Sequence, residues 1–134
     1  NLKSEAWASV CLSDKDVGTY QAALEEASKA NALEPNDPTI FNTLGAAQYR
    51  LGSYQDALKT LAKSEEILSH MGEEPDPANL AFTAMTLHKI GRVEEAKAAL
   101  AQLRELCKDE QFAEDMEVSA FLVEAEGLIE GKKP

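Results

Sequence analysis

The sequence has few aromatic residues, only two cysteines and no long apolar run, and each shortage narrows the possible classes of protein. Aromatic side chains make up 6% of 134 residues, while the strong helix formers Ala, Leu, Glu and Lys are abundant. Cys11 and Cys107 lie nearly the whole chain apart, which favours free thiols in a reducing compartment. No stretch approaches the roughly 18 apolar residues of a membrane span, and no signal segment is visible. We therefore expect a single all-α domain over residues 1–134, cytoplasmic and without disulfides.

Basic residues are also scarce. The 13 Lys and Arg are outnumbered by 24 Asp and Glu, which gives a formal net charge of −11. Much of this excess lies between Glu105 and Glu130, where nine acids accompany the single base Lys108. Nucleic acids and anionic membranes would be repelled at long range, so neither is a predicted partner.

Catalytic and metal-binding motifs are missing as well. The chain has no nucleophile elbow, phosphate-binding loop, HExxH motif or paired CxxC motif. His70 and His88 have no neighbouring cysteine with which to form a zinc site, and the acids of residues 69–77 lack the EF-hand pattern. The sequence thus predicts a protein that is not an enzyme and needs no metal or cofactor.

An internal repeat organises most of the chain. Trp7, Val10, Gly18, Tyr20 and Ala23 recur, all at one constant spacing, as Phe41, Leu44, Gly52, Tyr54 and Ala57. A third copy follows at a slightly longer spacing, with Leu80, Gly91, Val93 and Ala96, and the added residues fall in the Pro- and Gly-containing segment 69–77. Each copy is an apolar-periodic stretch, a glycine and a second periodic stretch, which predicts a helix-turn-helix hairpin.

The expected helices cover residues 4–16, 19–33, 38–51, 54–69, 77–90 and 93–107. Gly18, Gly52 and Gly91 would each follow a first helix in the left-handed conformation that glycine adopts at least cost. Small residues mark the places where paired helices approach: Ala23, Ala57 and Ala96 in the second helices, and Gly45 and Ala84 in the first. A seventh helix over Asp109–Gly131 has one apolar side and is expected to cap the last hairpin.

The segment FNTLGAAQYRLGSYQDALKTLAKS, residues 41–64, resembles the tetratricopeptide repeat. The resemblance implies three antiparallel hairpin repeats, at about 4–37, 38–71 and 77–108, in a right-handed solenoid closed by a capping helix at about 109–131. The pattern departs from the family at Gln48, which stands in an aromatic place, and at Asp14, where an acid would face the core. We expect Asp14 to fray or break the first helix before Ser13.

A weaker resemblance links NTLGAAQYRLGSYQDAL and AFLVEAEGLIEG to the C-terminal tetratricopeptide segments of planctomycete-type bacterial serine/threonine kinases. It implies a scaffold portion of a larger bacterial signalling protein.

The family geometry implies that the first helices line a concave groove that binds a peptide or helix of a partner protein. The groove residues implied in this way are Leu12, Lys15, Asn42, Ala46, Tyr49, Arg50, Ala81, Met85, His88 and Lys89. Basic residues among them, in an otherwise acidic chain, predict a partner with apolar anchors and an acidic group. Two alternatives stay open: the cations serve only their own helix C-termini, or the stack is a self-association module that forms a homo-oligomer.

Overall fold

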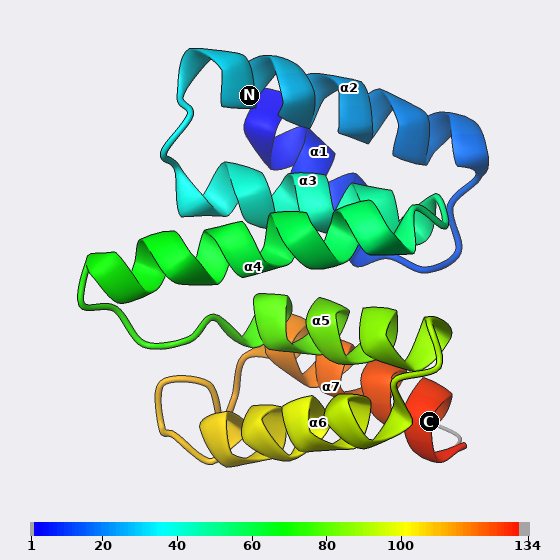
Figure 1. Ribbon diagram of the computed structural model, residues 1–134, viewed down its shortest axis with the longest axis vertical. Coiled ribbons are helices and arrows are strands. Elements are labelled where there is room, and N and C mark those ends of the chain that lie inside the picture. The colour runs from blue at the N-terminus through cyan, green and yellow to red at the C-terminus, as the bar shows by residue number, and fades with distance from the viewer. Residues whose placement is uncertain (1, 132–134) are drawn as a thin grey trace. The chain divides into compact units, whose positions relative to one another are not determined.

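The computed structural model of the protein describes residues 2–131, and in that range it is all-α, with seven helices and no strand (Figure 1). The helices are α1 (Leu2–Cys11), α2 (Val17–Leu33), α3 (Pro38–Arg50), α4 (Tyr54–His70), α5 (Pro77–Lys89), α6 (Val93–Cys107) and α7 (Met116–Glu130). None of these described helices is long and apolar enough to cross a membrane. The chain forms two compact units, residues 1–74 and 75–134, which are described separately.

The first unit consists of two helix pairs. Helix α1 packs on α2 and α3 packs on α4, while α3 also contacts both members of the first pair. Its core is built from small and aliphatic side chains, namely Ala6, Val10, Ala23, Ala27, Ile40, Ala46, Ala47, Ala57 and Leu61, together with Tyr20 and Tyr49. Ala23 and Ala57, which recur in the sequence, are 2% and 0% exposed, so the predicted small-residue positions are indeed buried.

The second unit is one helix pair with a third helix across it. Helix α5 packs on α6, and α7 contacts both, as α3 contacts α1 and α2 in the first unit. The rings of Phe82 and Phe121 meet edge to face with centroids 5.4 Å apart, a favourable aromatic geometry that fixes α7 on α5. Leu100 and Leu103 of α6 and Val118 of α7 complete the core.

The turns α3–α4 and α5–α6 have the same geometry. Gly52 and Gly91 adopt φ of 83° and 85°, in the left-handed region. The following N–H groups close the helix ends in the same way, Ser53 donating to the carbonyl of Gln48 (2.8 Å) and Arg92 to that of Leu87 (2.9 Å). This bond satisfies a carbonyl that the helix would otherwise leave unpaired. The predicted role of these two glycines is confirmed.

The first turn is different, and two expectations fail there. Helix α1 ends at Cys11 rather than at residue 16, so the expected break before Ser13 is confirmed but the expected range 4–16 is wrong. Gly18 lies in the first turn of α2 and has no left-handed φ, so it is not the counterpart of Gly52. The cause is local: Asp16 accepts a hydrogen bond from the Thr19 N–H at 2.8 Å and starts α2 at Val17, before the predicted position.

The seventh helix is also shorter than predicted. The expected range begins at Asp109, whereas α7 begins at Met116, and residues 108–114 form turns. Asp109 accepts a hydrogen bond from the Gln111 N–H at 2.9 Å, and Asp115 accepts from Glu117 (2.9 Å) and Val118 (3.1 Å). Aspartate side chains that bind nearby backbone N–H groups compete with helix propagation, which moves the start to the residue after Asp115.

The aspartates that cap α3, α5 and α7 are evenly spaced along the chain. Asp76 lies as far from Asp37 as Asp115 lies from Asp76. Each carboxylate accepts a hydrogen bond from the N–H two residues on, at 2.9, 2.8 and 2.9 Å. Helix α7 therefore begins at the same position in the repeat as α3 and α5, which are the first helices of their pairs.

Candidate functional site

The end of α1 and the turn that follows it, residues 10–16, form a corner that contains two of the predicted groove residues, Leu12 and Lys15, and that a third contacts. We call this the α1–α2 corner. Arg50 reaches it from the end of α3: its Nε donates to the Val10 carbonyl at 2.9 Å and its Nη2 to the Cys11 carbonyl at 3.3 Å. These carbonyls belong to the last turn of α1, where carbonyl groups lack helical partners. The guanidinium thus stabilises the C-terminus of α1, a neighbouring helix, rather than that of its own helix.

Tyr20 holds the rest of the corner. Its hydroxyl donates to the Leu12 carbonyl and accepts a hydrogen bond from the Lys15 N–H at 3.1 Å. The phenol is buried, whereas the Leu12 side chain is 49% exposed and Lys15 is exposed. A buried aromatic anchor therefore fixes a turn that presents one apolar and one cationic side chain to solvent.

Tyr49 lies next to Arg50 near the end of α3. The residue is 8% exposed, and its ring packs against that of Tyr54, with centroids 5.7 Å apart and planes tilted by 52°. The guanidinium carbon of Arg50 lies 5.7 Å from the centroid of the Tyr49 ring, within the range of a cation–π contact. Tyr49 thus orients the guanidinium of Arg50 and has little surface left for a ligand.

Half of the predicted groove residues are packing residues in this conformation. Asn42, Ala46, Tyr49, Ala81 and Met85 are all 8% exposed or less. Asn42 is unusual among them, because its Oδ1 is enclosed and accepts no hydrogen bond from the residues that the structure describes. The predicted residues that reach solvent are Leu12, Lys15, Arg50, His88 and Lys89.

His88 and Lys89 lie in the last turn of α5, in the second unit. Lys89 is exposed, while His88 is half-buried and its Nδ1 is enclosed without a hydrogen bond from any described residue. The carbonyl of His88 accepts the N–H of Gly91 at 3.1 Å, which ties this turn to the α5–α6 connection. A cation at the end of α5 also interacts favourably with the helix dipole, so Lys89 has a structural role available in addition to binding.

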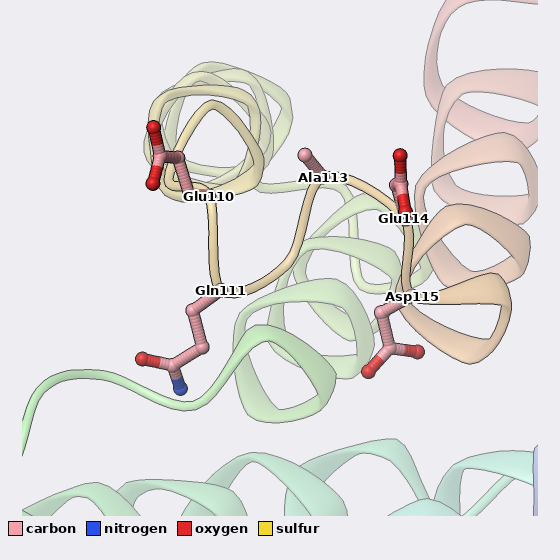
Figure 2. A pocket seen from close by; sticks show the side chains of 5 residues that line it. All are labelled: Glu110, Gln111, Ala113, Glu114 and Asp115. Carbon is pink, nitrogen blue, oxygen red and sulfur yellow. The ribbon is translucent and has the colours of Figure 1, made fainter.

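An acidic depression of about 470 Å³ lies at the turn before α7, lined by Glu110, Gln111, Ala113, Glu114 and Asp115. Figure 2 shows that the Glu110 and Asp115 carboxylates point to different sides of the loop. Asp115 is already used to cap α7. Among the described residues no group of His, Cys, Asp or Glu side chains is placed to hold a metal ion. The depression is a solvated acidic turn.

The two cysteines, both half-buried, are in no disulfide. Burial and the nearby Glu126 carboxylate raise the pKa of the Cys107 thiol. A raised pKa lowers the fraction of reactive thiolate, so Cys107 has the properties of a packing residue.

The fold is all-α, and its α3–α4 and α5–α6 hairpins share the same caps and turns. Comparisons of the chain with models of protein families, with curated proteins and with solved structures find no significant match.

Proposed function

We propose that the chain is a protein-binding scaffold of the tetratricopeptide kind, in which stacked hairpins form a right-handed solenoid and the first helices carry the recognition residues. The observation that supports this best is the recurrence of one hairpin design: an aspartate cap, a first helix and a left-handed glycine, as in Asp37 to Gly52 and Asp76 to Gly91. Repeated hairpins of this kind bury a continuous core by stacking on their neighbours and use the remaining surface for binding.

The α1–α2 corner is the binding surface that the side chains favour. Lys15 offers a cation and Leu12 an apolar contact, and both are exposed on a turn that Tyr20 holds in place. Arg50 is committed to the α1 carbonyls, so Lys15 is the residue we expect to meet an acidic group. The proposed ligand is a peptide segment that combines an acid with an apolar anchor, and the weaker kinase-segment resemblance fits a scaffold within a larger signalling protein.

Selection of random peptides displayed on phage against the full chain tests this proposal. We expect the selected peptides to share an acidic and an apolar residue, and Lys15→Glu to weaken their affinity by about tenfold or more, equivalent to about 1.4 kcal/mol. Lys59→Glu, on the exposed side of α4, is the matched control. Arg50→Glu is avoided, because it would release the end of α1 as well as change the surface charge. Selected peptides whose affinity is the same for Lys15→Glu and wild type would contradict the proposal.

Self-association is the alternative function. Met116 and Val123 of α7 are 86% and 43% exposed, and exposed apolar side chains favour contact with another chain. Sedimentation velocity over a wide concentration range distinguishes the two: a dimer that persists in Lys15→Glu and is lost in Val123→Lys would favour assembly over peptide binding.

A further inference from the structure

Helix α7 takes the place in its unit that the first helix of the next pair takes in a stack of hairpins. Its cap Asp115 follows Asp76, the cap of α5, at the same spacing at which Asp76 follows Asp37. It contacts both α5 and α6, just as α3 contacts both α1 and α2. In the first unit, however, α3 is itself covered by α4, and in the described part of the second unit no helix follows α7 to cover it.

The register identifies which face of α7 this leaves open. In α3 the residue at the crossing with α4 is Gly45, where a Cβ would lie 2.7 Å from the Leu61 side chain. At the spacing that separates the capping aspartates, the equivalent residue of α5 is Ala84, which is 0% exposed in the α5–α6 pair. At the same spacing again, the equivalent residue of α7 is Val123, and its exposed fraction is 43%. Val123 therefore marks the face of α7 that a second helix covers in the other hairpins.

This face, which we call the α7 open face, consists of Leu122, Val123 and Ile129. Leu122 and Ile129 are half-buried, so Val123 is not the only apolar side chain with exposed surface on this side of α7. Glu126 lies within this face, three or four residues from each of its members, and both Glu126 and Glu130 bind Arg104. Helix α7 contains four glutamates and neither Lys nor Arg. A face that combines apolar and acidic side chains is complementary to an amphipathic helix that carries basic residues.

We propose that the α7 open face binds a basic amphipathic helix of a partner protein, in the place that α4 takes on α3. This inference rests on the hairpin repeats of the proposed function and adds a second surface and partner chemistry. Val123 stands in α7 where Gly45 stands in α3, and its side chain takes up the space into which a residue such as Leu61 would pack. The partner helix therefore presents a small residue at this point. A second copy of this chain would bring α7 glutamates against α7 glutamates, and the repulsion disfavours it.

The test uses two fluorescein-labelled peptides built on the α4 sequence, residues 54–70. The basic peptide carries Leu61→Ala, Asp56→Lys, Glu65→Lys and Glu66→Lys, and the acidic peptide carries Leu61→Ala, Lys59→Glu and Lys63→Glu. Fluorescence anisotropy of each is measured against the full-length chain. We expect the basic peptide to bind and the acidic one not to bind, and Val123→Lys to weaken binding by about tenfold or more. Val17→Lys, at an exposed valine of α2, is the matched control and should leave the affinity unchanged.

Three results would overturn this inference. They are similar affinity for the two peptides, undiminished binding by Val123→Lys when circular dichroism shows it folded, and a wild-type dimer that Val123→Lys dissociates. If the basic helix does not bind the α7 open face, the Lys15-dependent binding of selected acidic peptides is unaffected. The two proposals can therefore be contradicted separately. If Val123→Lys does not fold, Val123→Ser removes the apolar contact at the same exposed position and serves in its place.

Discussion

Gly45 of α3 and Leu61 of α4 meet at the crossing of their helices, where a Cβ on residue 45 would lie 2.7 Å from both Cγ and Cδ2 of Leu61. Leu61 has no exposed surface and its backbone nitrogen lies 3.4 Å from the same point. The leucine cannot withdraw freely, because it is packed on all sides. The absence of a side chain at residue 45 therefore sets how closely the two helices approach.

We expect Gly45→Ala to lower the free energy of unfolding by about 1 kcal/mol or more. Overpacking costs about 1 to 3 kcal/mol, and the better helix propensity of alanine returns at most about 1 kcal/mol. Urea denaturation followed by circular dichroism measures the change. The matched control is Gly18→Ala, because its Cβ would meet only Asp16 Oδ1, at 3.5 Å. There the same substitution should leave stability unchanged or raise it, and equal losses at both sites would contradict the crossing argument.

Arg50 is expected to hold α1 onto the first unit. Arg50→Lys removes the planar fork that reaches the Val10 and Cys11 carbonyls, so we expect a loss of about 1 kcal/mol or more in unfolding free energy. Hydrogen exchange followed by mass spectrometry should show faster exchange in α1 and no change in α5 to α7. Arg92→Lys is the control, because the ion pair of Arg92 with Glu95 lies on an exposed helix start. Unchanged protection of α1 in Arg50→Lys would contradict this role.

The sequence predicts the hairpins well where the backbone itself demands a residue type. Gly52 and Gly91 are predictable because a left-handed φ after a helix selects glycine. Gly18 shares their spacing but not their conformation, since Asp16 caps α2 and Tyr20 fixes the preceding turn through its hydroxyl. Residue spacing carries no information about those side-chain hydrogen bonds, so a prediction of the first turn from spacing alone is wrong.

The binding surface is less predictable than the hairpins, because burial depends on which helix packs where. Ala46 and Met85 have the spacing of groove residues, yet both are fully buried. The sequence also does not predict the structural role of Arg50, since the carbonyls that it binds belong to a helix far away in the chain. The capping aspartates are a signal that the sequence does contain: the even spacing of Asp37, Asp76 and Asp115 indicates where α7 begins and that it continues the series of first helices.

Asp76 and Asp16 both cap helices, but their effects on stability should have opposite dependence on pH. Burial raises the pKa of Asp76 above its ordinary value of 3.8, while hydrogen bonds from Thr19 lower the pKa of Asp16. The folded state therefore binds the Asp76 proton more tightly than the unfolded state does, and binds the Asp16 proton less tightly. The Asp76 contribution is lost as pH rises from about 3.8 through its raised pKa, and the Asp16 contribution is lost as pH falls through its lowered pKa.

Urea denaturation of Asp76→Asn and Asp16→Asn between acidic and neutral pH measures both effects. Asparagine keeps an oxygen acceptor for the cap and cannot ionise. The unfolding free energy of wild type minus that of Asp76→Asn should fall as pH rises, and the corresponding difference for Asp16→Asn should rise. Parallel curves for the two variants would contradict the assigned pKa directions.

Arg104 is expected to secure α7 on α6. Its Nε and Nη2 donate to Glu126 Oε2 at 2.9 and 2.7 Å, and its Nη2 also binds Glu130. The side chains are 35%, 21% and 29% exposed, so solvent screens the interaction in part. We expect Arg104→Met to lower the unfolding free energy by about 1 kcal/mol and to speed hydrogen exchange in α7. The loss should shrink at high salt, because added ions screen the charges that the substitution removes.

Lys108→Met is the matched control for this pair. Lys108 bonds Glu105 at 2.8 Å within one helix end, with side chains 71% and 74% exposed, so its loss should be close to zero. If Arg104→Met and Lys108→Met have equal effects, the α6–α7 ion pair does not hold α7. A larger effect of Arg104→Met that persists unchanged at high salt would contradict the electrostatic role, because added ions screen the attraction between charges.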